Sequence, residues 1–156
     1  MARLVIVRHG TAVMGLDNDA ARTLTEEGKA QADLAGQWLA QCVLGAEASI
    51  IMSSPYVRAR ETAEAISKHS KSVIQTSTLL RPDSDPLALA DILTGEFENL
   101  IVVSHLPLVG RLAAVMVDGE VYDQPWSTAE CWVLEGDLIA RGCMRVSKTW
   151  YPGLEF

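Results

Sequence analysis

The chain has 156 residues, of which 49% are hydrophobic and 21% are charged. These values are typical of one soluble, folded domain and exclude a disordered protein. The net charge of −7 argues against general affinity for nucleic acid, because that binding requires a basic surface. No stretch of the sequence approaches the roughly 18 uninterrupted apolar residues of a membrane span. We therefore expect neither a nucleic-acid partner nor a membrane contact.

The N-terminus and the cysteines both favour a cytoplasmic protein. The chain enters a strand-like run at once, without the basic region and long apolar segment of a signal peptide. Its three cysteines, Cys42, Cys131 and Cys143, show no Cys-x-x-Cys or metal-ligand spacing. We expect them to be buried free thiols in a reducing compartment.

Strands and helices are predicted to alternate along the chain. The β-branched run Leu4–Val7 is too short for a helix and predicts a buried strand. Ser54 and Pro55 have the pattern of a helix N-cap followed by proline at the first helical position. The predicted elements are, in order, strand 4–7, a helix capped by Thr25 and continuing to about 43, strand 49–52, helix 55–68, strand 73–76, a helix from Asp85 through Leu93, strand 100–103, helix 107–117, and strands 131–134 and 138–146.

This alternation predicts the fold class. Helices between strands indicate a mostly parallel central sheet that is covered by helices on both faces. The last two predicted strands would add an antiparallel edge. We expect a single three-layer α/β domain that spans residues 1–156.

Two of the three histidines directly follow the two clearest strands. Arg8, His9 and Gly10 come after the first strand, and Ser104 and His105 come after the run 100–103. An open α/β sheet binds its ligands beyond the carboxyl ends of its strands. His105 alone is equally compatible with a boundary residue. Arg8 next to His9 indicates an anion-binding site, because a guanidinium can donate hydrogen bonds to two oxygens of a phosphate or carboxylate.

Arg58 completes a predicted phosphate site. It lies in the first turn of the helix after the second strand, where free backbone amides favour anions. A neutral histidine can be the nucleophile in phosphoryl transfer through one ring nitrogen, while a hydrogen bond fixes the other. The second histidine would be a charged donor to the phosphoryl oxygens. This chemistry needs no metal, and the sequence offers no carboxylate-rich cluster for magnesium, so we expect no cofactor.

Three motifs along the chain resemble the histidine phosphatase superfamily, which is also called the phosphoglycerate mutase-like group. Arg8-His9-Gly10 is similar to its first motif, Ser54-Pro55-x-x-Arg58-Ala59-x-x-Thr62 to its second arginine segment, and Ser104-His105 to its late histidine. Within the superfamily, the segments Ser104–Gly110 and Arg22–Gly28 and the short chain resemble the SixA-type phosphohistidine phosphatases. The resemblance covers nearly the whole chain.

The resemblance implies a role for each matched residue. His9 would be the phosphorylated nucleophile, and Arg8, Arg58 and His105 would complete the phosphate pocket. Asp19 and Arg22 lie in the loop that borders the pocket in this subgroup, which implies contact with the substrate. The alternatives for these two are an Asx-turn aspartate and a solvated surface arginine.

The sequence departs from the superfamily at the general acid. Many mutases and sugar-bisphosphatases place a glutamate after the third strand, but the region 80–86 contains none. Asp83 is a candidate acid, whereas Asp85 is better explained as a helix cap. Phosphohistidine releases an imidazole, which is readily protonated near neutral pH. A site without a strong acid therefore suits a phosphohistidine substrate.

The hypothesis from the sequence is a metal-independent phosphatase that hydrolyses protein phosphohistidine through a covalent phosphohistidine intermediate on His9. Its partner would be a phosphohistidine-bearing protein, for which a histidine phosphotransfer domain is a candidate. One alternative is a small-molecule phosphomonoesterase or mutase of the same superfamily. Another is a non-catalytic phosphate-binding protein. A metal site on His9 and His105 is disfavoured, because no third ligand is evident.

Overall fold

A six-stranded sheet forms the middle layer of the computed structural model, which describes residues 1–15 and 17–154. The strands are β1 (Ala2–Arg8), β2 (Ala48–Ser53), β3 (Lys71–Thr76), β4 (Leu100–Ser104), β5 (Cys131–Gly136) and β6 (Arg145–Trp150). Their spatial order is β3-β2-β4-β1-β5-β6. The pairs β3–β2, β2–β4 and β4–β1 are parallel, whereas β5 is antiparallel to both β1 and β6. The predicted α/β class and mostly parallel sheet are confirmed.

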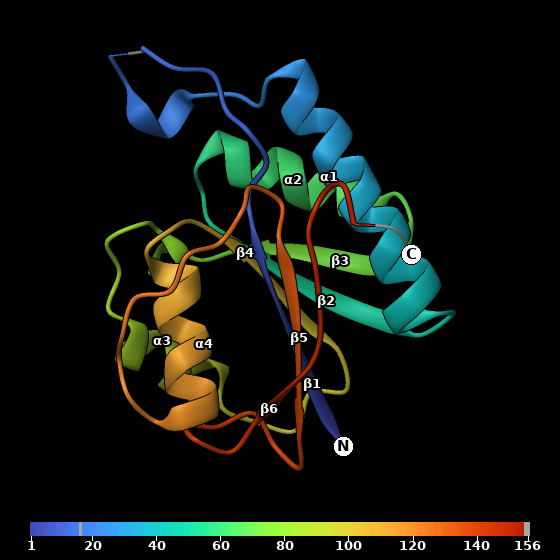
Figure 1. Cartoon of the computed structure of the whole chain (residues 1–156), viewed down its shortest axis with the longest axis vertical. Coiled ribbons are helices and arrows are strands. Elements are labelled where there is room, and N and C mark those ends of the chain that lie inside the picture. Colours follow the sequence, from blue (N-terminus) through green and yellow to red (C-terminus); the bar gives the residue numbers. More distant parts are fainter. Residues whose placement is uncertain (16, 155–156) are drawn as a thin grey trace.

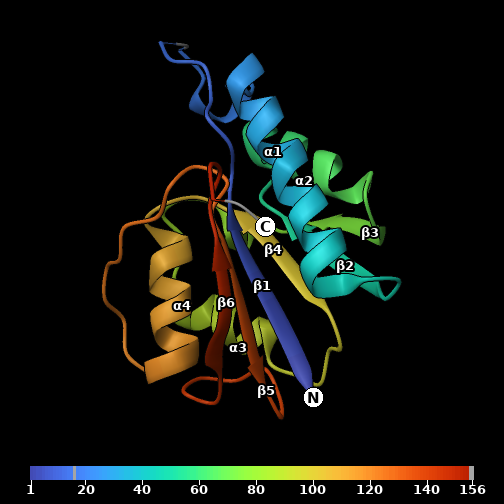
Figure 2. The same cartoon turned by 45° about the vertical axis from the view of Figure 1, so that its right-hand side comes forward.

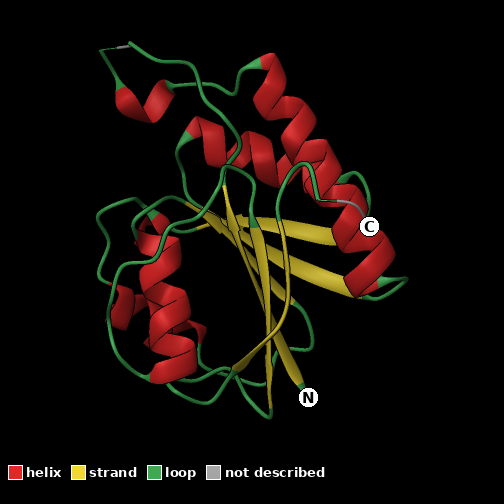
Figure 3. Ribbon diagram, in the orientation of Figure 1, coloured by secondary structure: helices red, strands yellow, loops and turns green. Residues whose placement is uncertain are grey.

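Helices cover both faces of the sheet (Figures 1, 2 and 3). They are α1 (Glu26–Leu39), α2 (Val57–Ser67), α3 (Pro86–Leu93) and α4 (Leu108–Asp118). Successive side chains of β1 point to opposite faces. Leu4 and Ile6 belong to the core that includes α3 and α4, whereas Val5 and Val7 belong to the core that includes α1 and α2. The run Leu4–Val7 is therefore apolar throughout because both of its faces are buried.

Two predicted helix caps are present. The Thr25 hydroxyl accepts a hydrogen bond from the Gly28 backbone N–H at 3.0 Å. The Asp85 carboxylate accepts one from the Leu87 N–H at 2.9 Å. Each bond satisfies a donor of the first helical turn that has no partner within the helix. Asp85 is therefore a cap, as its sequence context predicted.

The predicted start of α2 is wrong. The helix begins at Val57, with Tyr56 as its N-cap, and not at Pro55. The Ser54 hydroxyl accepts a hydrogen bond from the Tyr56 N–H at 3.2 Å and also contacts His105. Tertiary contact with a distant segment therefore sets the conformation of residues 54–56, which local sequence could not reveal.

The last predicted strand is also wrong. Strand β6 is Arg145–Trp150, and most of the predicted segment 138–146 is a loop. Ile139 and Met144 are buried in the core beside α3 and α4, so the apolar pattern there reports burial, and Ile139 forms an isolated antiparallel bridge with Gly95 in place of a strand. Gly142 in this loop has a φ of 67°, which favours glycine.

The cysteines only partly match the expectation. All three are free thiols, but only Cys131 is buried, while Cys143 is exposed on the loop before β6. No helix within residues 1–15 and 17–154 is long and apolar enough to cross a bilayer.

Candidate functional site

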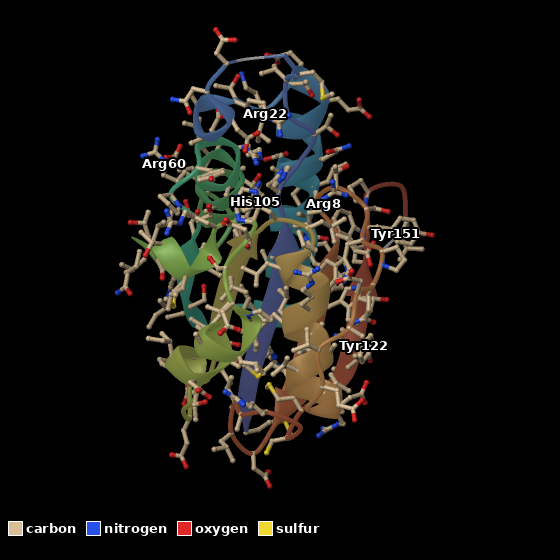
Figure 4. The ribbon with its side chains drawn as sticks, turned by 90° about the vertical axis from the view of Figure 1, so that its left-hand side faces the viewer. Arg8, Arg22, Arg60, His105, Tyr122 and Tyr151 are labelled. Carbon is tan, nitrogen blue, oxygen red and sulfur yellow. The ribbon has the colours of Figure 1, made fainter. Side chains whose placement is uncertain are left out.

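The sheet brings the two predicted histidines together at the carboxyl ends of neighbouring parallel strands. Arg8 at the end of β1 is in register with Ser104 at the end of β4. The His9 N–H then donates to the Ser104 carbonyl at 3.0 Å. The two imidazole centroids lie 5.0 Å apart with the rings at 63°. Figure 4 shows Arg8 and His105 at this end of the strands, with Arg22 in the loop above them.

Hydrogen bonds fix the His9 ring with one nitrogen free to react. Nδ1 donates to the Gly10 carbonyl at 2.6 Å, which leaves Nε2 as the unprotonated nitrogen. Nε2 accepts a hydrogen bond of 3.3 Å from Nε of Arg58. Burial, together with the charges of Arg58, Arg8 and Arg22, lowers the pKa of His9 to about 4, although the hydrogen bond to Gly10 opposes the shift. The imidazole is therefore neutral at physiological pH, as a nucleophile requires.

Gly10 is required by a close backbone approach. A Cβ atom at this position would lie 2.6 Å from the carbonyl oxygen of Gly28 in α1. The Gly10 N–H also donates to Oγ1 of Thr62 at 3.1 Å. Thr62 lies one helical turn after Arg58, and its hydroxyl donates to the Arg58 carbonyl at 2.9 Å. This contact between the loop after β1 and α2 explains the final residue of the second motif.

Arg58 is 3% exposed and is held from two sides. Its Nη1 donates to the Asp19 backbone carbonyl at 2.7 Å, and its Nη2 contacts Oδ2 of Asp19 at 3.2 Å. Asp19 therefore holds the outer end of the guanidinium. Its Nε remains directed to Nε2 of His9 at 3.3 Å. A phosphoryl group on His9 would meet this cationic donor.

Arg22 joins the same network from the opposite side of Asp19. Its Nε lies 2.9 Å from Oδ1 of Asp19, and its Nη1 donates to the Val13 carbonyl at 3.1 Å. Asp19 thus bridges two arginines, and a carboxylate in that position does not itself attract phosphate. The expectation that Asp19 contacts the substrate stays a prediction, and the structure shows Asp19 in contact with Arg58 and Arg22.

Arg8 is held by the segment 126–130 and not by a carboxylate. Its Nη1 donates to the Trp126 carbonyl at 2.7 Å. The same segment fixes the end of β1, because the Arg8 N–H donates to the Glu130 carbonyl and the Ala129 N–H donates to the His9 carbonyl, both at 3.1 Å. Burial lowers the pKa of Arg8, and the charge of Glu130 opposes that shift. Sequence gave no signal for this segment, because its contacts are made by backbone atoms.

His105 is 1% exposed. Its Nε2 lies 2.8 Å from the Ser54 hydroxyl. Burial, together with the charges of His9, Arg58, Arg22 and Arg8, lowers its pKa to about 2. The predicted charged donor is therefore neutral in the free protein, because four basic groups surround a buried ring. A bound phosphate would oppose this shift, but a donor hydrogen bond is available from the neutral ring as well.

Carboxylates contribute little to the electrostatic environment of His9 and His105. Among the described residues, the charged groups that shift the pKa values of His9 and His105 are arginines and, for His105, His9. Asp83, the candidate acid, is exposed. Within residues 1–15 and 17–154, no three His, Cys, Asp or Glu side chains are grouped so that they could hold a metal ion. The arrangement is a group of arginines around a neutral imidazole, which suits a phosphoryl group.

Comparisons with known proteins agree with this geometry. Residues 4–82 match the profile of the histidine phosphatase superfamily (branch 1). A phosphohistidine phosphatase SixA homolog of Haemophilus influenzae is 34% identical over 122 residues, which are 71% of this chain and 74% of that protein. Phosphohistidine phosphatase SixA of Escherichia coli is 31% identical over 126 residues, or 76% of each chain. A solved structure of the protein histidine phosphatase SixA with tungstate has a TM-score of 0.79 at 26% identity, over 96% of this chain and 97% of that one.

Proposed function

The chain belongs to the histidine phosphatase superfamily (branch 1), and from that premise we propose that it hydrolyses phosphohistidine in proteins through a phosphohistidine intermediate on His9. One observation carries the proposal most directly. The Nε2 lone pair of a buried, neutral His9 accepts a hydrogen bond from Nε of Arg58. This arrangement prepares an imidazole nucleophile beside a group that binds phosphoryl oxygens.

Each of the four site residues has a part in the proposed reaction. Nε2 of His9 attacks phosphorus, the P–N bond of the substrate breaks, and the leaving imidazole takes a proton. Arg58 and Arg8 bind the phosphoryl oxygens, and His105 donates a hydrogen bond to them. Water then attacks the phosphoenzyme and releases inorganic phosphate, which restores neutral His9. Positioning and electrostatic stabilisation account for most of the catalysis of phosphoryl transfer.

The substrate class follows from the groups around the histidines. An alkyl phosphate releases a basic alkoxide, which needs a proton from a nearby acid. The described groups that shift the pKa values of both site histidines include no carboxylate. An imidazole leaving group takes its proton near neutral pH without such help. Phosphohistidine therefore fits this site better than a phosphate ester.

The proposed partner is a folded protein that presents phosphohistidine on a convex surface. His9 is only 8% exposed, so the phosphorylated side chain must project from its own surface to reach Nε2. A histidine phosphotransfer domain, with its histidine on an exposed helix, meets this requirement. A reducing compartment such as the cytoplasm is part of the proposal and agrees with three free cysteines.

A substrate panel tests this proposal. We expect kcat/KM to be highest for a phosphohistidine protein, lower for aryl phosphates such as a phosphotyrosine peptide, and lowest for phosphoserine and phosphoglycerate. Phosphoramidate serves as a small substrate with the same P–N bond and separates the chemistry from partner recognition. If phosphoglycerate or a sugar phosphate were the best substrate, the proposed function would be wrong, and Asp83→Asn would then test for the acid.

A further inference from the structure

A fully buried serine contacts the histidine that the reaction uses as a donor. Ser54 follows β2 and is 0% exposed. Its Oγ lies 2.8 Å from Nε2 of His105 and accepts a hydrogen bond from the Tyr56 N–H. On the other side of the ring, Nδ1 of His105 is buried without a hydrogen-bond partner among the described residues. A buried polar atom without a partner needs an explanation.

We propose that Ser54 is a positioning residue that donates its hydroxyl hydrogen to Nε2 of His105 and so fixes the ring proton on Nδ1, as the donor for the phosphoryl group on His9. The proposal rests on the proposed function, because it assigns a ligand to the unpaired Nδ1. It requires no change in the number of protons in the site. It assigns only the position of the one proton that a neutral imidazole carries.

Hydrogen-bond counting supports this direction of the Ser54 contact. A serine hydroxyl has one hydrogen and two lone pairs. The Tyr56 N–H occupies one lone pair at 3.2 Å. If Nε2 of His105 carried the ring proton, it would occupy the other lone pair, and the buried hydroxyl hydrogen would be left without an acceptor. An unsatisfied buried donor destabilises the folded protein, so donation from Ser54 to Nε2 is the favoured arrangement.

The surroundings keep the ring in this orientation. The Tyr56 ring packs against His105 with a centroid separation of 5.0 Å at 69°, and the His9 ring contacts it at 5.0 Å. Ser54, Tyr56 and Arg58 are alternate residues of one segment. Ser54 and Tyr56 contact His105, and Arg58 contacts His9. With the ring held in place, the choice of tautomer decides whether Nδ1 presents a hydrogen or a lone pair. Only the hydrogen attracts a phosphoryl oxygen.

Ring-nitrogen NMR on the free, full-length protein tests the proposal without any substrate. Long-range ¹H–¹⁵N spectra at pH 7 should show His105 with a protonated Nδ1 and an unprotonated Nε2. Addition of inorganic phosphate should shift Nδ1 more than Nε2. Protonated Nε2 in the wild-type protein would overturn the proposal, whatever the enzyme's substrate proves to be.

Two variants separate this role from simple packing. Ser54→Ala should allow the Nε2-protonated tautomer and lower kcat for phosphoramidate about five- to tenfold, which is the effect of one buried hydrogen bond. Ser53→Ala is the matched control, because Ser53 is equally buried and its hydroxyl donates to the Ser54 carbonyl at 2.8 Å. It should leave the His105 tautomer unchanged. A folded Ser54→Ala protein that kept the wild-type tautomer would refute the assignment.

Discussion

The two ends of β1 each place an arginine beside β4, and their surroundings differ. At the start of the strand, Nη1 of Arg3 donates to Oδ1 of Asn99 at 2.8 Å and lies 3.7 Å from Oε2 of Glu47. Asn99 in turn donates to Glu47 at 2.7 Å, which closes the network. At the end of the strand, Arg8 is held by the neutral Trp126 carbonyl. Its charge acts on two imidazoles and helps to lower their pKa values.

This difference separates a structural charge, that of Arg3, from the charge of Arg8, which we propose to be functional. The Arg3 charge is balanced by a neighbouring carboxylate, so its contribution is to the stability of the fold. At the end of the strand, the positive charge of Arg8 lies beside His9 and His105 and disfavours their protonation. The same charge favours the binding of an anion. Perturbed pKa values of this kind cluster at functional sites.

Lysine substitutions at the candidate site and at the start of β1 should affect different properties of the protein. Arg8→Lys or Arg58→Lys should lower kcat/KM on the order of 10²-fold, because lysine lacks the planar fork that binds two oxygens. Arg3→Lys should leave kcat/KM within about twofold and reduce the free energy of unfolding by about 1 kcal/mol, the usual contribution of one hydrogen bond. Steady-state kinetics with phosphoramidate and urea denaturation measure both quantities. Full activity of Arg58→Lys would contradict the two-oxygen contact.

The carboxylate on Arg58 should prove to be an orienting group. Asp19→Asn retains the backbone acceptor but removes the charge that bridges Arg58 and Arg22. We expect kcat/KM to fall about fivefold to tenfold as the guanidinium loses its fixed outer end. Asp17→Asn, two residues away, is the control and should have wild-type kinetics. If Asp19→Asn instead tightened phosphate binding and preserved kcat, Asp19 would be a competitor for the phosphate.

His9 and His105 should make the free energy of unfolding depend on pH. Folding lowers the pKa of His9 to about 4 and that of His105 to about 2, from an ordinary value of 6.5. At pH values between the folded and unfolded pKa, the unfolded chain binds more protons than the folded chain. The free energy of unfolding is therefore highest above pH 6.5 and declines as the pH falls. The expected loss is about 1 kcal/mol per histidine at pH 5.5.

Urea denaturation at pH 7.5 and 5.5 measures this loss. A double variant, His9→Asn with His105→Asn, should lose less stability over the same interval. His69 and the carboxylates are common to both proteins and cancel in the comparison. An equal loss in the two proteins would place the pH dependence outside the site.

Sequence alone predicted the parts of the site that depend on strand position. His9 and His105 follow buried apolar runs, and parallel pairing of β1 with β4 brings those ends together. Arg58 was predicted from its motif, and α2 does place it against His9. The buried apolar strands and the order of the motifs along the chain are therefore sufficient to predict that the two histidines and their arginines lie close together.

Long-range contacts were beyond the reach of the sequence. Ser54 had the pattern of a helix cap, but its hydroxyl is engaged by His105, 51 positions away. The Arg8 contact uses a backbone carbonyl 118 positions away, which leaves no trace in residue type. The neutral state of His105 depends on burial among arginines from three separate segments. Tertiary context decides such features, and local patterns do not encode it.

Covalent labelling of His9 tests the central claim most directly. Wild-type protein is mixed with ³²P-phosphoramidate and quenched in base, and the labelled peptide is then identified. A small donor is used so that every protein-bound label belongs to this chain. We expect transient label on His9, rapid loss of that label, and no label in a folded His9→Ala protein, which should also have no turnover. Label on His105, or undiminished turnover by His9→Ala, would contradict this claim.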